Sequence, residues 1–338
     1  MTRFDYLIPS LVRRKIAALW HAMLLPVLAV FCGLAGAADA KPTAETGVPT
    51  PAEVRATVAE TLPYGDGVLW KVQRKGAAPS YVFGTIHLNR DDVLAVPAAV
   101  KTALAGARSA SFEVLFDDSG SETMSRAIYT GGHRTLDALI GPDLFAEVVE
   151  AAEPYDLSVH ELRNLKPWAL MLLFSKPPSV HQSEEEGKPV LDRWLYEQAE
   201  TKGIPTFGLE TMRQHLSPFM DVPLEDQRNM VKALLNKRSS DQTEVERRHA
   251  EMVRHYLEGD IDGILAMSGE AETPEEKALE EAFMKRLLDD RNHLMVERML
   301  PRLKEGKAFV AIGAGHLPGQ DGILSLLTER GYSVERIH

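Results

Sequence analysis

Four polar side chains lie in or just beyond short apolar segments typical of strands: His87, Glu113, Glu210 and His316. Each histidine closes a Gly-x-x-His sequence, either Gly84-Thr-Ile-His87 or Gly313-Ala-Gly-His316. Imidazole and carboxylate groups together are the usual ligands of a catalytic zinc, manganese, iron or cobalt ion. These residue types therefore predict one polar site in which His87, His316, Glu113 and Glu210 hold a divalent metal ion.

The two glycine–histidine loops also have a structural explanation. A glycine three residues before a histidine lets the backbone turn sharply or approach a ligand closely. A single histidine after a strand is more often a hydrogen-bonded residue of the core or surface, and one Gly-x-x-His sequence carries little information. Because two such loops occur near opposite ends of the chain, a shared functional site and two structural histidines both stay open.

Arg291 is a second candidate, because it lies on the apolar stripe of a predicted helix. The other members of the stripe are Met284, Leu288, Met295 and Met299. A buried arginine needs an acidic partner or an anionic ligand, so it either forms a structural salt bridge or contacts a substrate. Asn292 beside it could orient a ligand or complete a structural contact.

The elements that must position these residues are short strands at both ends of the chain and helices between them. The predicted strands are 69–72, 81–83, 109–116, 204–209, 308–312 and 332–337. We therefore predict an α/β fold with a central mixed sheet flanked by helices and a large helical insertion over roughly residues 120–300. Residues 64–338 are expected to form a single domain.

The first 40 residues have the composition of a secretory signal peptide. A basic start precedes an apolar run, and the small residues after it give cleavage after Ala37 or Ala40. An uncleaved membrane anchor is the alternative, but His21 and Pro26 within the apolar run favour cleavage. Residues 41–63 read as a linker. The mature protein is then expected in the periplasm or outside the cell, with no stable insertion in the membrane.

Net charge and cysteine content exclude several classes of function. The full chain carries a net charge of −11, and residues 1–40 hold more basic than acidic groups. An acidic protein without a basic patch argues against nucleic acid or anionic lipid as a partner. The single cysteine, Cys32, lies in the predicted signal peptide. The mature chain therefore has no cysteine nucleophile and no thiolate metal ligand.

The chain resembles the TraB/PrgY/GumN family, which is related to the TIKI extracellular metalloproteases. The resemblance starts at about Leu69 and reaches the C-terminus. It rests on several separated sequences in order: Phe83-Gly-Thr-Ile-His-Leu88, Glu113, Pro167-Trp168, Gly208-Leu-Glu-Thr211, Arg291-Asn-His-Leu-Met295 and Gly313-Ala-Gly-His-Leu-Pro-Gly319. Several matches in the right order are more specific than any one of them.

The resemblance implies a fold like that of the erythromycin-esterase and ChaN group, with the two histidines, the glutamates, Arg291 and Asn292 in one site. In the TIKI branch that site resembles a divalent-metal peptidase site. Carried over, His87 and His316 would be metal ligands, and Glu113 and Glu210 would be ligands or bases. Arg291 would stabilise developing negative charge. Asp192 matches an acidic position of the family loosely.

Three functional hypotheses follow. The first is a metal-dependent hydrolase that acts on a peptide or other small substrate, with manganese, cobalt, zinc or iron as its metal. The second is a non-catalytic periplasmic binding protein for a peptide, haem or a metal, which the same ligands would serve. The third is an accessory protein of envelope or polysaccharide assembly. The sequence does not distinguish among them and gives no oligomeric state.

Overall fold

The computed structural model describes residues 61–338 apart from 132–133, 186, 238–241 and 268–272. The predicted signal peptide, residues 1–40, and most of the predicted linker, residues 41–63, lie outside the described residues. Among the described residues, none of the helices combines the length and the apolar character that crossing a bilayer requires.

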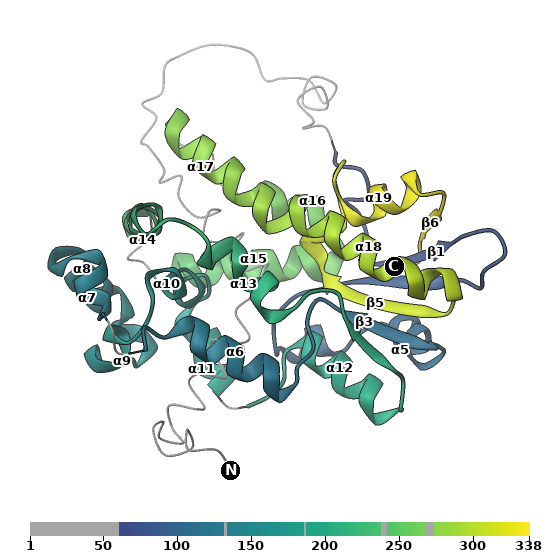
Figure 1. The fold of residues 1–338 in the computed structure, drawn as a ribbon, viewed down its shortest axis with the longest axis horizontal. Coiled ribbons are helices and arrows are strands. Elements are labelled where there is room, and N and C mark those ends of the chain that lie inside the picture. The colour runs from purple at the N-terminus through teal and green to yellow at the C-terminus, as the bar shows by residue number, and fades with distance from the viewer. Residues whose placement is uncertain (1–60, 132–133, 186, 238–241, 268–272) are drawn as a thin grey trace.

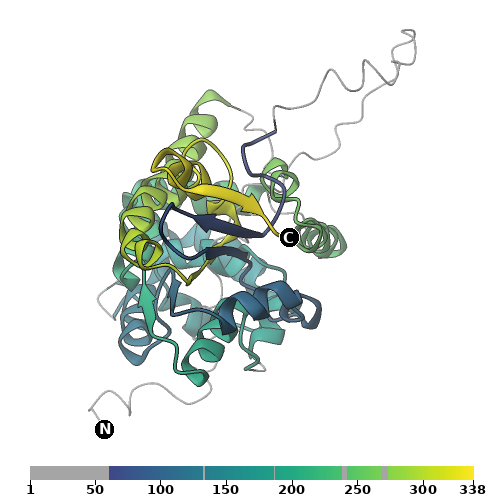
Figure 2. The same ribbon diagram turned by 90° about the vertical axis from the view of Figure 1, so that its right-hand side faces the viewer.

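Within the described chain, six strands form one mixed sheet in the order β4-β3-β5-β2-β1-β6. Strands β4, β3, β5 and β2 are parallel, whereas β1 runs antiparallel to both β2 and β6. Figure 2 shows β6 beside β1 at one edge of the sheet. The strands are β1 Leu69–Gln73, β2 Ser80–Thr85, β3 Ser109–Phe112, β4 Thr206–Gly208, β5 Ala308–Gly313 and β6 Ser333–Arg336. The prediction of an α/β fold with a mixed sheet is confirmed.

Helices fill the chain between β3 and β5, and β4 divides them into two groups (Figure 1). The predicted strand over 109–116 ends at Phe112, so Glu113 lies beyond the strand and not within it. Between β3 and β4 come α6 Asp118–Ile128, α7 Leu136–Ile140, α8 Pro142–Ala152, α9 Val159–Arg163, α10 Pro167–Phe174, α11 Pro178–Glu185 and α12 Leu191–Thr201, whereas α4 Asp91–Leu94 and α5 Ala98–Ala105 lie between β2 and β3. After β4 come α13 Met212–Met220, α14 Leu224–Lys237, α15 Gln242–Glu258, α16 Ile261–Ala266, α17 Pro274–Met284 and α18 Asp290–Glu305, and α19 Ile323–Glu329 follows β5.

The central strands are buried on both faces because helices cover both sides of the sheet. Every residue of β5 is buried, as expected for an apolar strand inside a parallel sheet. Successive residues serve opposite faces: Phe309 packs in one hydrophobic cluster, and Val310 packs in the other. Helices α5, α12 and α15 contribute to the first cluster, whereas α18 and α19 contribute to the second.

A third hydrophobic cluster of the described residues lies among the helices themselves. Trp168 of α10 stacks on Phe219 of α13 with their ring centroids 6.2 Å apart. Phe219 in turn meets Phe283 of α17 edge to face. The cluster draws in α7, α8 and α14 as well, and these helices lie on the far side of the molecule from β1 and β6 (Figure 1). This helical layer fixes α13 and the α17–α18 segment, which both reach the end of the sheet.

His249 is buried on α15, one of the helices that cover the sheet, and it provides a test of this helix packing through the pH dependence of stability. Burial, together with the nearby charges of Arg90 and Lys176, lowers the pKa of His249 to about 4 in the folded protein. The unfolded state therefore binds the proton first as pH falls, and stability is lost between about pH 6.5 and 4. We expect this residue alone to cost about 2 kcal/mol between pH 7 and 4.5.

The substitution His249→Gln should flatten, without abolishing, the acid side of the stability profile measured by urea unfolding. His316 contributes in the same direction, because its pKa is also lowered. The exposed His160→Gln is the matched control and should keep the wild-type profile. Equal slopes for His249→Gln and the wild type would contradict the assignment.

Candidate functional site

The four residues predicted to share a site follow the ends of four neighbouring parallel strands. His87 follows β2, Glu113 follows β3, Glu210 follows β4 and His316 follows β5. The backbone N–H of Glu210 donates to the carbonyl of Glu113 at 2.7 Å, which extends the pairing of β3 and β4 by one step. All four are at most 8% exposed. The carboxyl ends of parallel strands thus bring them to one edge of the sheet.

Gly84 is required because the two histidine loops touch. A Cβ atom at this position would lie 2.7 Å from Leu317 Cδ1 and 3.0 Å from Ala314 Cα, both in the second loop. Its carbonyl also accepts a hydrogen bond from the Tyr256 hydroxyl at 2.9 Å. The glycine of the first loop therefore gives room to the second loop, whereas the sequence had suggested a sharp turn or a close approach to a ligand.

Asp192 of α12 holds His87. Its Oδ2 is hydrogen-bonded to His87 Nδ1, and its Oδ1 accepts from the hydroxyl of Thr85, the last residue of β2. Since both carboxylate oxygens act as acceptors, the proton of this pair lies on His87 Nδ1. A neutral His87 then carries its lone pair on Nε2. This hydrogen bond gives the loosely matched Asp192 a defined place in the site.

Asn292 of α18 holds His316 in a similar way. The side-chain amide donates through Nδ2 to the carbonyl of Asp321 at 2.9 Å, which turns Oδ1 toward His316. Oδ1 lies 2.5 Å from His316 Nδ1, so this nitrogen is the donor and Nε2 has the lone pair. His316 is fully buried, and its Nε2 has no hydrogen-bond partner in the described structure. A buried acceptor without a partner is costly and calls for an explanation.

Arg291 joins the two glutamates. Its Nη2 lies 2.7 Å from Glu113 Oε2 and 2.6 Å from Glu210 Oε2, and its Nε donates to both oxygens of Glu210. The π-helical segment Lys285–Asp289 immediately precedes α18, and the carbonyl of Leu287 in it accepts from Nη1 at 2.9 Å. Of the two explanations that the sequence left open, the structure shows the buried salt bridge.

His215 completes this network, and the sequence gave no indication of it. Its Nδ1 lies 2.9 Å from Arg291 Nη2, 3.2 Å from Glu210 Oε2 and 3.4 Å from Glu113 Oε2. Helix α13 starts right after Glu210 with Thr211 as its N-cap, so its first turn carries His215 back toward the strand ends. Because this contact depends on where α13 packs, spacing along the chain alone does not reveal it.

Glu113, Glu210 and His215 form the buried group whose ligand atoms lie close enough together to hold one metal ion. One atom of each of these residues lies 2.6–2.9 Å from Arg291 Nη2, and His215 Nδ1 lies 3.4 Å from Glu113 Oε2. In this arrangement the guanidinium is the cation of the group. A metal ion between those three atoms would require Arg291 to move.

The ionisation of the site follows from burial and from the charges around it. Burial raises the pKa of Glu113, but His316 and Arg291 lower it more strongly, to about 2. The pKa of Glu210 is also lowered, because Arg291 and His215 outweigh its burial. Burial and Arg291 lower the pKa of His316 to about 3. At neutral pH both glutamates are therefore anions and His316 is a neutral imidazole.

The charges of the site leave room for a divalent cation. Among the described groups of the cluster, the buried carboxylates of Glu113 and Glu210 pair with the guanidinium of Arg291, whereas the buried carboxylate of Asp192 pairs with His87. A surplus of buried negative charge is unfavourable unless it is balanced by a cation or by protons. The unpartnered Nε2 of His316 and this negative surplus both fit a metal ion bound beside the two histidine loops.

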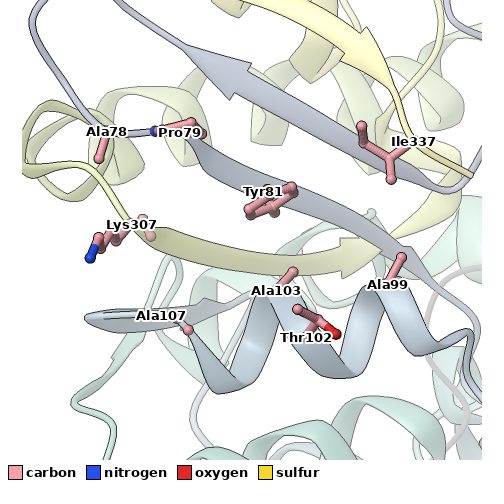
Figure 3. Close-up of a pocket in the computed structure, with 11 residues that line it drawn as sticks. Ala78, Pro79, Tyr81, Ala99, Thr102, Ala103, Ala107, Lys307 and Ile337 are labelled. Atoms are coloured by element: carbon pink, nitrogen blue, oxygen red, sulfur yellow. The ribbon is translucent and has the colours of Figure 1, made fainter.

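A surface hollow of about 440 Å³ lies elsewhere in the molecule, at the opposite ends of β2 and β5 (Figure 3). Helix α5 lines it with the small side chains of Ala99, Thr102 and Ala103, and Lys307 lies at one end. It contains none of the buried histidines or carboxylates. This hollow therefore adds no titratable histidine or carboxylate to the candidate site.

Fold and site together define an α/β protein with a buried imidazole–carboxylate cluster at the carboxyl edge of a mostly parallel sheet. The profile of the TraB/PrgY/gumN family matches residues 68–336, which include the whole sheet and every residue of the cluster. The chain belongs to this family, as the separated sequence matches predicted.

Curated relatives are metalloproteases of animals. The chain is 23% identical over 312 residues to Metalloprotease TIKI2 of Xenopus tropicalis, which covers 79% of this chain and 59% of that protein. It is 23% identical to Metalloprotease TIKI1 of Danio rerio, with 79% and 62% covered. A TIKI homolog of Amphimedon queenslandica is 24% identical, with 80% and 61% covered. The chain thus spans about three fifths of the length of these relatives. No solved structure gave a significant match.

Replacing Arg291 by methionine tests how far the cluster depends on its guanidinium. Arg291→Met leaves Glu113 and Glu210 buried without their cation, and such a loss typically costs about 3–5 kcal/mol. Arg254→Met is the matched control, because Arg254 pairs with Glu258 on the exposed face of α15. Its effect should stay within about 1 kcal/mol. Chemical denaturation measures both, and similar small losses would show that Arg291 is not the centre of the network.

Proposed function

We propose that this protein is a metal-dependent hydrolase that acts on peptide bonds. The observation that carries the proposal is the fully buried His316, whose Nε2 lone pair has no hydrogen-bond partner within the described structure. The metalloprotease relatives support the same class of reaction. The buried group of two glutamates and a histidine in the same cluster supplies the ligand types that a divalent metal accepts, with Arg291 as the cation that now balances them.

His316 and His87 would hold the metal through Nε2, with Glu113 as a carboxylate ligand. Glu113 accepts from the Gly313 N–H at 2.5 Å and from Arg291, so both of its oxygens are held in place as an anion. Manganese, cobalt, zinc and iron all accept two imidazoles and a carboxylate. When bound, such a metal supplies Lewis acidity toward a carbonyl and lowers the pKa of a water molecule.

The remaining residues position these groups. Asp192 and Asn292 fix the ring orientation of His87 and His316 through their Nδ1 atoms. Glu210 binds Arg291 with both oxygens, and Arg291 in turn holds Glu113. We propose that Glu210 and Arg291 act by holding Glu113, because the described contacts of Arg291 face the protein and not an open crevice.

Metal content and hydrolysis test the proposal together. We expect the purified protein to bind a divalent metal, measured by elemental analysis, and to cleave members of a peptide library, measured by mass spectrometry. His316→Ala and His87→Ala should lose metal and at least 100-fold in kcat/KM, since removal of a ligand abolishes the centre. His293→Ala is the matched control, because His293 is adjacent to Asn292 but half exposed.

Two results would overturn this function. If neither metal binding nor hydrolysis changes in His87→Ala and His316→Ala, the cluster is not a metal centre. If the protein binds a metal, haem or peptide through these histidines and no product forms with any peptide, it is a binding protein.

We further propose that the protein is exported and acts in the periplasm or outside the cell. The basic, apolar and small-residue segments of residues 1–40 support this location. N-terminal sequencing of the protein recovered from the periplasm or medium should start at Ala38 or Lys41. Replacing Ala37 and Ala40 together with leucine should block cleavage. An intact N-terminus on wild-type protein in the membrane fraction would contradict export by cleavage.

A further inference from the structure

The partners of the two histidine loops differ in charge although they occupy equivalent places. Each histidine is hydrogen-bonded through Nδ1 to a side-chain oxygen of a helix, which is α12 for His87 and α18 for His316. The oxygen belongs to the carboxylate of Asp192 for His87 and to the neutral amide of Asn292 for His316. Both partners are buried, at 5% and 2% exposed, so water does not screen this difference.

The carboxylate of Asp192 is held by two hydrogen bonds at the start of a helix. The residue lies in the first turn of α12, where the helix dipole favours an anion. The Thr85 hydroxyl donates to its Oδ1, and His87 Nδ1 occupies its Oδ2. No cationic side chain is paired with it in the described structure, so its charge acts on His87.

The contacts of Asn292 likewise require a neutral amide at this position. Its Nδ2 must donate to the Asp321 carbonyl at 2.9 Å, which a carboxylate could not do. Its Oδ1 faces His316, and Arg291 precedes it on the same helix. An amide oxygen orients the imidazole but pulls on its Nδ1 proton less strongly than a carboxylate does.

We infer that Asp192 and Asn292 are unequal positioning residues, which make His87 the tightly bound ligand of the metal and His316 the weakly bound one. The inference rests on the proposed metal centre and adds a division of labour between its two histidines. A carboxylate behind an imidazole raises the basicity of the ligand, and loss of such a partner typically lowers metal affinity about 10- to 100-fold.

The first measurement needs no metal. Long-range ¹H–¹⁵N NMR of metal-free protein labelled at histidine reports which ring nitrogen carries the proton, and His87→Ala and His316→Ala assign the signals. We expect both rings to be protonated at Nδ1 and unprotonated at Nε2. A proton on Nε2 of either ring would overturn the inference, because that nitrogen would then not be preset as a ligand.

The second measurement uses Co²⁺ alone, with affinity followed through its visible absorption. Asp192→Asn keeps the shape but removes the charge, and we expect it to weaken Co²⁺ binding by about 10- to 100-fold. Thr85→Val keeps the charge but frees one oxygen of Asp192, and a smaller loss in the same direction is expected. Asn292→Asp should tighten binding, or leave it unchanged where the lost bond to Asp321 offsets the added charge.

These outcomes separate the inference from the function on which it rests. A wild-type protein that binds no Co²⁺ contradicts the metal centre, whereas the NMR result still decides the tautomers. If Asp192→Asn and Thr85→Val bind Co²⁺ as tightly as the wild type does, the metal centre stands but the inference is overturned. If Asp192→Asn does not fold, Thr85→Val still tests the inference, because it removes the hydrogen bond that holds the Asp192 carboxylate behind His87.

Discussion

The ion pair network of Arg291, Glu113 and Glu210 is the interaction on which the site depends. It joins the end of β3, the end of β4 and the start of α18, which are far apart in the sequence. Each of these charges would be very unfavourable if it were buried alone, so the three elements must meet for any of them to be stable. His215 adds a bond from α13, and the strand ends are thereby fixed against two helices.

The histidine loops are then placed relative to this network by the sheet. Strand β5 lies between β3 and β2, so Glu113 and the two histidines follow adjacent strands. Gly313 bonds Glu113 through its N–H, and Gly84 makes room for the second loop. Helices α12 and α18 bring Asp192 and Asn292 to the Nδ1 atom of each ring. These hydrogen bonds fix the orientation of both imidazoles, which is how the partners of metal-binding histidines act.

Much of this arrangement could be predicted from local patterns. The six predicted strands are all present, and the family match covers nearly all of the described chain. Arg291 was recognisable because a charge on an apolar stripe must have a buried partner. Its particular partners were not recognisable, since they depend on which strand end faces α18. The contact of His215 could not be predicted for the same reason. The salt bridge of Arg291 is shown by the structure, and its role toward a substrate stays a prediction.

The sequence by itself determined where the strands lie, though not the residue at which each one ends, because short apolar runs with a polar residue in or after them specify a strand and the neighbourhood of its functional side chain. It also determined that Arg291 is buried. Only the tertiary structure decided that the four strand ends are parallel neighbours, that Arg291 fills the space between two glutamates, and that each histidine bonds through Nδ1. Those facts depend on long-range packing and on hydrogen-bond geometry, in which residues more than a hundred positions apart compete for the same buried atoms.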